Sequence, residues 1–216
     1  ILVGDYLLSK CFEMMVEDGN LELLKLLATT SSEIAQGEVL QLQHNKEIDI
    51  LEETYLNIIS SKTASLFAAA TKVGAIIAEK DLKYKNALEF YGKNLGLTFQ
   101  IADDTLDYNS ELKLFGKEIG NDFYEGKVTL PIILLYQKSN EDEKIKLKEL
   151  FKKKDRSVEE FKSILIMIKK YNIIFECYRK AEHFINLASN SLSIFNKSKE
   201  KDMLQGLTSF SLERTF

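Results

Sequence analysis

Apolar and polar residues follow one another along most of the chain with the period of an α-helix. Between residues 5 and 16 the apolar positions recur at steps of one, three and four, which places them on one helical face. The same pattern predicts three longer helices, over residues 21–43, 52–78 and 84–108, joined by short polar segments. We expect these four helices to pack as antiparallel neighbours.

A stretch without a sustained period follows the fourth predicted helix. Residues 109–126 carry three glycines, and a helix over residues 127–136 begins after them, with Pro131 in its first turns. An irregular segment of this length indicates a functional loop. The pattern then predicts three or four further helices, near residues 141–154, 157–170, 174–195 and 200–212.

The composition favours one all-α globular domain over residues 1–216. The chain is 45% hydrophobic and 29% charged, with a single proline and ten glycines, so it has enough apolar material for a core and few helix breakers. Its 33 acidic and 29 basic residues are interspersed, which argues against a nucleic-acid partner. No apolar run approaches the roughly 20 residues of a membrane-spanning helix, and no signal peptide opens the chain.

The two cysteines, Cys11 and Cys177, lie far apart and show no CxxC spacing, which predicts reduced thiols in a cytoplasmic protein. Any metal must therefore be held by oxygen atoms. The chain begins at Ile1 in an apolar stretch that has no capping residue. We expect an upstream segment to be missing.

The most informative segment is an aspartate cluster late in the fourth predicted helix. Asp103 and Asp107 are four residues apart and project from one face, and Asp104 flanks them. Like charges at this spacing repel, and the helix dipole disfavours carboxylates at a C-terminus. A hard cation such as Mg²⁺, which shares carboxylate oxygens with substrate phosphates and water, relieves the repulsion. Metal binding is therefore favoured over a merely exposed helix end.

Three lysines offer the positive charge that a diphosphate requires. Lys62 precedes Thr63 in the middle of the third predicted helix, whereas Lys117 and Lys127 follow glycines near the two ends of the loop. A single lysine is usually a solvated surface charge. Only the combination of these lysines with the aspartates therefore predicts a site.

Several other polar and small residues have a plainer interpretation. Gly92 and Gly96 should each cost their helix roughly 1 kcal/mol relative to alanine, which indicates tight helix packing. Glu38 and Gln41 form an i, i+3 pair that faces either an internal cavity or solvent.

The two histidines, His44 and His183, have no partner at the spacing of a metal site or a catalytic triad, and neither serine nor cysteine lies in a nucleophile motif. We interpret both histidines as surface or packing residues.

Taken together, the motifs resemble those of the trans-polyprenyl diphosphate synthases in order and spacing. The resemblance covers residues 1–136 and is greatest to bacterial long-chain synthases such as octaprenyl diphosphate synthase. The matching positions are Gly4-Asp5-Tyr6, Gly37-Glu38 with Gln41, Lys62-Thr63-Ala64, Tyr91-Gly92 with Gly96, Phe99-Gln100-Ile101 with Asp103-Asp104 and Asp107-Tyr108, Gly116-Lys117, Gly120 with Asp122, and Gly126-Lys127 with Thr129-Leu130-Pro131.

This resemblance implies an antiparallel helical bundle of the isoprenoid synthase type, incomplete at the N-terminus, that forms a homodimer. It implies head-to-tail elongation of an allylic prenyl diphosphate with isopentenyl diphosphate, to a long-chain product for quinone side chains. Mg²⁺ would be bound by Asp103 and Asp107, with Asp104 in support, and we expect all three aspartates to be catalytic. The residues that would contact the diphosphates or metal-bound water are Lys62, which we also expect to be catalytic, Thr63, Gln100, Lys117 and Lys127.

One departure from the family pattern leaves an alternative open. Family members carry two aspartate-rich motifs on facing helices, and the cluster that begins at Asp103 matches only the second. The first would lie upstream of the segment that matches Ile1. The alternative is therefore a truncated, non-catalytic partner or regulatory subunit of a complete synthase. A terpene cyclase would share the aspartate-rich helix, but its usual Asn/Ser/Glu metal motif is absent from the sequence.

Overall fold

The computed structural model describes residues 1–109 and 119–213, and every regular element in these ranges is helical, which confirms the all-α prediction. The elements are α1 (Leu2–Asp18), α2 (Leu21–Gln43), α3 (Glu52–Ile59), the π-helical turn η1 (Ser60–Ala64), α4 (Ser65–Ile77), α5 (Leu82–Leu106), α6 (Asn121–Glu125), α7 (Leu130–Lys138), α8 (Glu141–Lys152), α9 (Val158–Lys170), α10 (Ile173–Ser191), the 3₁₀ turn η2 (Leu192–Ile194) and α11 (Lys199–Glu213).

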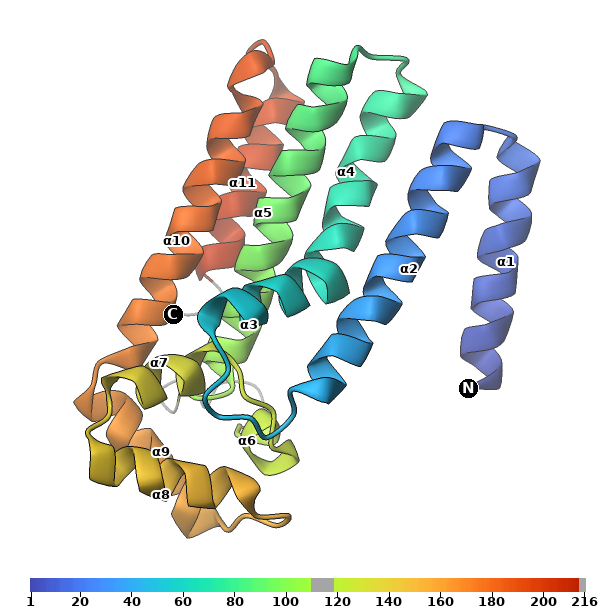
Figure 1. Cartoon of the computed structure of the whole chain (residues 1–216). Helices are drawn as coiled ribbons and strands as arrows, with labels where there is room; N and C mark the ends of the chain where they lie inside the picture. The colour runs from blue at the N-terminus through green and yellow to red at the C-terminus, as the bar shows by residue number, and fades with distance from the viewer. Residues whose placement is uncertain (110–118, 214–216) are drawn as a thin grey trace.

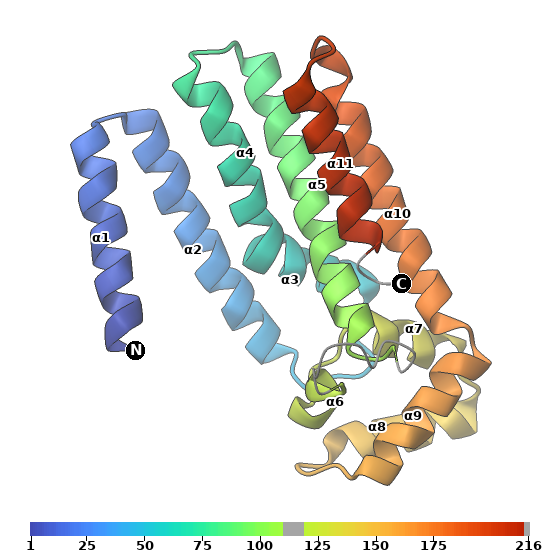
Figure 2. The same ribbon diagram turned by 180° about the vertical axis from the view of Figure 1, so that it is seen from behind.

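The long helices stand side by side, each antiparallel to its neighbour, in the order α1, α2, α4, α5 and α10 (Figure 1). Helix α11 packs against α5 and α10. In the view turned by 180°, α11 lies nearer to the viewer than these two helices (Figure 2). The shorter helices α6 to α9 gather at the end of the bundle where α5 finishes. The first four predicted helices are thus confirmed as antiparallel neighbours, with α3 turning across the end of α4.

Local signals explain where the helices begin and end. Gly19 adopts a left-handed conformation with φ of 70° and terminates α1. The side chain of Asn20 then accepts hydrogen bonds from the second and third amides of α2. Asn140 and Ser157 each form a reciprocal capping box at the start of α8 and α9.

One predicted boundary was wrong, and one predicted helix contains an irregularity that the sequence did not indicate. The helix expected over residues 52–78 contains the π-helical turn η1, and periodicity alone does not reveal one inserted residue. The helix expected from residue 127 begins only at Leu130, because Gly126 turns the chain with φ of 78° and Thr129 is extended. Helix α6 lies within the predicted irregular loop, of which residues 110–118 are outside the described ranges.

Close helix packing confirms the interpretation of the two glycines of α5. A Cβ atom at Gly92 would lie 2.3 Å from the carbonyl oxygen of Phe67, and one at Gly96 would lie 2.7 Å from the Cα atom of Ala64. Gly37 of α2 is equally close to the backbone of Lys62. These contacts bring η1 between α2 and α5, so that its side chains meet those of both helices.

The main core lies beneath the end of α5, where α3, α7, α9 and α10 meet. The fully buried Phe123 fixes the short helix α6 to this core through ring contacts with Phe151 and Phe161. By contrast, α1 contributes no buried residue. Among the described residues, no helix is both long and apolar enough to cross a membrane.

Candidate active site

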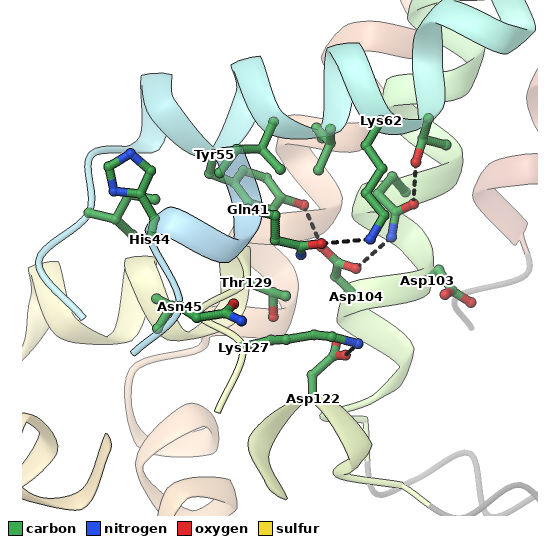
Figure 3. Close-up of a pocket in the computed structure, with 16 residues that line it drawn as sticks. Gln41, His44, Asn45, Tyr55, Lys62, Asp103, Asp104, Asp122, Lys127 and Thr129 are labelled. Carbon is green, nitrogen blue, oxygen red and sulfur yellow. Dashed lines mark hydrogen bonds and ion pairs between the residues drawn. The ribbon is translucent and has the colours of Figure 1, made fainter. Parts of the chain in front are cut away.

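A polar pocket of about 140 Å³ opens where the C-terminal end of α5 meets α2, α3, η1 and the α6–α7 connection (Figure 3). Of the eight residues predicted for the site, six line it: Lys62, Thr63, Gln100, Asp103, Asp104 and Lys127. Lys117 lies outside the described residues. A larger cavity of about 700 Å³ between α2, α4 and α5 is lined mainly by polar side chains and includes none of the eight.

Asp104 is the most deeply buried carboxylate of the pocket, with 5% of the residue exposed. Burial raises its pKa to about 7, and the negative charge of Asp122 adds to the shift. Two hydrogen bonds oppose the shift by stabilising the carboxylate: the Tyr55 hydroxyl donates at 2.7 Å and the Gln100 amide at 2.8 Å. The carboxylate thus sits where a positive charge would stabilise it further.

The amide of Gln100 is held in one orientation by partners on both sides. Its nitrogen donates to Asp104, while its oxygen accepts a hydrogen bond of 2.8 Å from the Thr63 hydroxyl. Since Thr63 belongs to η1 and the other two belong to α5, this chain of hydrogen bonds connects the two elements. The packing of Gly96 against Ala64 brings them close enough to form it.

Lys62 projects from η1 toward α2, and it lies over the pocket in Figure 3. Its ammonium group donates to the side-chain oxygen of Gln41 at 2.6 Å and pairs with the Glu38 carboxylate at 2.6 Å. Gln41 lines the pocket, so for this residue the cavity-facing alternative is correct. The Glu38 side chain is 49% exposed, so its pairing with Lys62 is made in contact with water.

Asp107 points away from the other two aspartates of its cluster. Its carboxylate accepts hydrogen bonds from the backbone N–H groups of Gly120, Asn121 and Asp122, at 3.1, 3.2 and 2.9 Å. It is not among the described residues that line the pocket. The carboxylate therefore fastens α6 to the end of α5, and its role as a metal ligand stays a prediction.

Helix α6 delivers Asp122 to the wall of the pocket opposite Asp104, and Lys127 follows one turn later. Burial raises the pKa of Asp122, and the charge of Asp107 raises it further. Lys127 pairs with Glu125 at 2.6 Å and approaches Asp122 at 3.5 Å. Asp122 matches the family pattern together with Gly120, two residues earlier, but the predicted site does not include it.

The predicted site also leaves out other residues of the pocket, among them Tyr55, His44 and Thr129. Tyr55 gives no signal, because its partner Asp104 is 49 positions away. His44, interpreted as a surface or packing residue, lies on the pocket rim and contacts Glu47 at 2.6 Å. Thr129 lines the pocket with a buried hydroxyl that has no hydrogen-bond partner among the described residues.

The chemistry of the donors suits a hard cation. Asp103, Asp104 and Asp122 present only oxygen atoms to one pocket, and Mg²⁺ binds through one or two carboxylates together with phosphates and water. No three His, Cys, Asp or Glu side chains of residues 1–109 and 119–213 form a complete metal cluster by themselves. The three carboxylates thus fit a cation whose remaining coordination positions are filled by phosphate oxygens and water.

Comparisons with known proteins agree in sequence and in fold. The profile of the family described as "Polyprenyl synthetase" matches residues 1–168. An all-trans-nonaprenyl-diphosphate synthase (geranyl-diphosphate specific) from Rhodobacter capsulatus is 35% identical over 99% of this chain and 65% of its own length. The octaprenyl diphosphate synthase of Escherichia coli (strain K12) is 43% identical over 62% of this chain and 41% of its own length.

Solved structures give the same result. A polyprenyl synthase from Caulobacter crescentus CB15, complexed with calcium and isoprenyl diphosphate, superposes with a TM-score of 0.94 at 36% identity, over 100% of this chain and 66% of that one. The chain thus spans about two thirds of the length of the relatives that it matches from end to end.

Proposed function

The chain belongs to the polyprenyl synthetase family, and from this premise we propose that it carries the diphosphate-binding half of a trans-prenyltransferase site. In the proposed reaction an allylic prenyl diphosphate is elongated by isopentenyl diphosphate. One observation above all supports this assignment. A single pocket brings carboxylates from two elements, Asp103 and Asp104 of α5 and Asp122 of α6, together with two lysines, Lys62 and Lys127.

The proposed reaction breaks the bond between the allylic carbon and its diphosphate, and the diphosphate leaves with the electron pair. The double bond of isopentenyl diphosphate then forms the new carbon–carbon bond, and a proton is lost. Bound Mg²⁺ would supply positive charge that stabilises the departing diphosphate. Asp103, Asp104 and Asp122 would hold this cation, and we retain Asp107 as a further predicted ligand.

The two lysines of the pocket would receive the diphosphate. Each now pairs with a glutamate that remains in contact with water: Glu38 is 49% exposed and Glu125 is 60% exposed. Because exposed ion pairs are weak, Lys62 and Lys127 can exchange these partners for phosphate oxygens at little cost. Their charge then offsets the negative charge that grows on the leaving group.

Thr63 and Gln100 would shape the floor of the diphosphate site. Their hydrogen bonds to each other and to Asp104 fix the position of the Gln100 amide before any ligand arrives, and pre-positioned dipoles need no rearrangement during the reaction. We assign Lys117 to the same site by resemblance alone.

We also propose a long-chain product for quinone side chains, one domain over residues 1–216, a cytoplasmic location and a homodimer. The names of the nonaprenyl and octaprenyl relatives support the product class. The free thiols of Cys11 and Cys177 support the location. Exposed apolar side chains on α1, namely Leu7, Leu8 and Phe12, support a subunit interface.

The proposal is tested by incubating the chain with farnesyl diphosphate, labelled isopentenyl diphosphate and Mg²⁺. We expect labelled, longer prenyl diphosphates from the wild-type chain and a loss of at least 100-fold in rate for Asp103→Ala. Asp142→Ala, at an exposed position on α8, is the matched control and should retain the wild-type rate. The assay is then repeated with a fusion protein in which the N-terminal third of a long-chain relative precedes this chain. If neither the chain alone nor the fusion protein forms product, the non-catalytic alternative is correct.

A further inference from the structure

The hydroxyl of Thr129 is one of two buried side-chain polar atoms in the described residues that have no hydrogen-bond partner; the other is the hydroxyl of Tyr108. Thr129 is only 4% exposed, yet it lies in the lining of the pocket. Buried polar atoms are nearly always paired, so an unpaired one at a pocket wall calls for an explanation.

The local sequence explains why this hydroxyl is available. Thr129 occupies the N-cap position of α7, where a threonine side chain normally accepts a hydrogen bond from the second or third amide of the helix. The second residue of α7 is Pro131, which has no N–H group. The third, Ile132, donates instead to the backbone oxygen of Thr129 at 3.0 Å. The helix is therefore capped by the main chain, and the side chain makes no cap hydrogen bond.

The surroundings indicate which ligand would suit the hydroxyl. Lys127 lies two residues before Thr129, and both line the same wall of the pocket as Asp122 (Figure 3). A hydroxyl beside an ammonium group and a carboxylate-held cation can donate a hydrogen bond to an anionic oxygen, and such charge-assisted bonds are stronger than neutral ones. A phosphate oxygen fulfils this requirement.

We propose that Thr129 binds the diphosphate directly, through a hydrogen bond from its hydroxyl to a phosphate oxygen. This inference rests on the proposed function and adds a residue to its ligand-binding set. The competing occupant is a buried water molecule. The Thr129 hydroxyl faces the Tyr108 phenol closely enough to lower the pKa of that phenol as a hydrogen-bonding group does. Tyr108 itself is therefore a second competing partner, either directly after a small movement or through a water molecule shared by the two hydroxyls.

The test compares Thr129→Val with the wild-type chain, because valine keeps the shape of threonine and removes only the hydroxyl. Inorganic pyrophosphate is titrated calorimetrically into each protein in the presence of Mg²⁺. We expect Thr129→Val to bind at least tenfold more weakly and Thr129→Ser, which keeps the hydroxyl, to stay within about threefold of wild type. Thr129→Ala is the second hydroxyl-free variant, and it should weaken binding as Thr129→Val does.

Denaturant unfolding without ligand provides the second measurement. The unfolding midpoint of Thr129→Val should equal or exceed that of the wild-type chain, because removing an unpaired buried hydroxyl takes no hydrogen bond from the free protein. A lower midpoint would mean that the hydroxyl is already bonded there, which overturns the inference.

Two binding results separate the inference from the proposed function. If Lys127→Ala and Asp103→Ala weaken pyrophosphate binding while Thr129→Val binds like wild type, the diphosphate site stands and Thr129 is not part of it. If the wild-type chain itself does not bind pyrophosphate with Mg²⁺, the diphosphate site and the role of Thr129 are both refuted.

Discussion

Asp104 illustrates how single residues of the pocket are poised for a cation. Its carboxylate is enclosed by the protein and repelled by Asp122, and within residues 1–109 and 119–213 it accepts hydrogen bonds from two donors, Tyr55 and Gln100. In the metal-free protein the neutral acid is therefore favoured up to about pH 7. A bound cation would reverse this preference by stabilising the charged form.

The raised pKa makes a prediction for stability. In the unfolded chain Asp104 titrates near 3.8, and in the folded chain near 7. Between these values the folded state holds a proton that the unfolded state has lost, so the free energy of unfolding should fall as the pH rises from about 4 to 7, with a slope of up to about 1.4 kcal/mol per pH unit. Above pH 7 this contribution to the slope disappears.

Asp104→Asn removes this titration and should flatten the slope. Urea unfolding of the metal-free proteins at pH 5, 6, 7 and 8 checks the prediction. Asp49→Asn is the matched control, because Asp49 is exposed and its pKa is lowered by the hydrogen bond from Lys148. An unchanged slope in Asp104→Asn would mean that Asp104 is ionised in the folded chain throughout this range.

At the scale of elements, short helices and turns place the site residues. Helix α6 has five residues and is held at both ends: Asp107 accepts hydrogen bonds from its first amides, and the Arg156 guanidinium donates to the carbonyl oxygen of Tyr124 at 3.3 Å. A helix this short is not stable alone. The orientation of Asp122 and the turn that leads to Lys127 therefore depend on these contacts.

Asp107→Ala should release the N-terminal end of α6 even in the absence of metal and substrate. We expect hydrogen exchange at the amides of Asn121 and Asp122 to accelerate at least tenfold, because both lose their acceptor. Asp103→Ala should leave these two amides protected. Equal protection in Asp107→Ala and the wild-type chain would contradict the anchoring role and leave metal binding as the only function of this carboxylate.

The contact between α4 and α5 aligns η1 with the aspartates, and it depends on glycine. Gly92→Ala would place a Cβ atom 2.3 Å from the Phe67 carbonyl oxygen, so the two helices must move apart. We expect a loss of about 1–3 kcal/mol in the free energy of unfolding. Gly74→Ala, where a Cβ atom meets nothing within 4 Å, should instead stabilise α4 by up to about 1 kcal/mol. Guanidinium unfolding checks both, and a Gly92→Ala variant as stable as Gly74→Ala would refute the close packing.

For the whole molecule, the helices and six of the residues that line the pocket were predictable, because their signals are local. Helical period and capping residues are read within a few positions, and Asp103 and Asp104 share one turn of helix. The remaining features depend on contacts between distant residues. Tyr55 meets Asp104 only after α3 and α5 have packed, and Asp107 turns to amides 13 to 15 positions later. Spacing along the sequence does not reveal such partners.

The exposed apolar side chains of α1 lead to a prediction about assembly. Leu7, Leu8 and Phe12 are 57%, 51% and 45% exposed, and exposed apolar patches commonly mark protein interfaces. Sedimentation velocity should show a dimer for the wild-type chain and a shift toward monomer for Phe12→Asp. Ile166→Asp, at an exposed apolar position on α9, should remain dimeric. A monomeric wild-type chain would refute the homodimer.

The central claim is that carboxylates of α5 and α6 hold a metal ion together with a diphosphate in one pocket. The most direct test is a crystal structure of the chain grown with Mn²⁺ and pyrophosphate, in which anomalous scattering locates the ion. Mn²⁺ favours the oxygen ligands that Mg²⁺ uses. We predict an anomalous peak bound by Asp103 or Asp104, with pyrophosphate between it and Lys62 or Lys127. Ordered pyrophosphate elsewhere, or a pocket without manganese at saturating concentrations of both, would contradict the account.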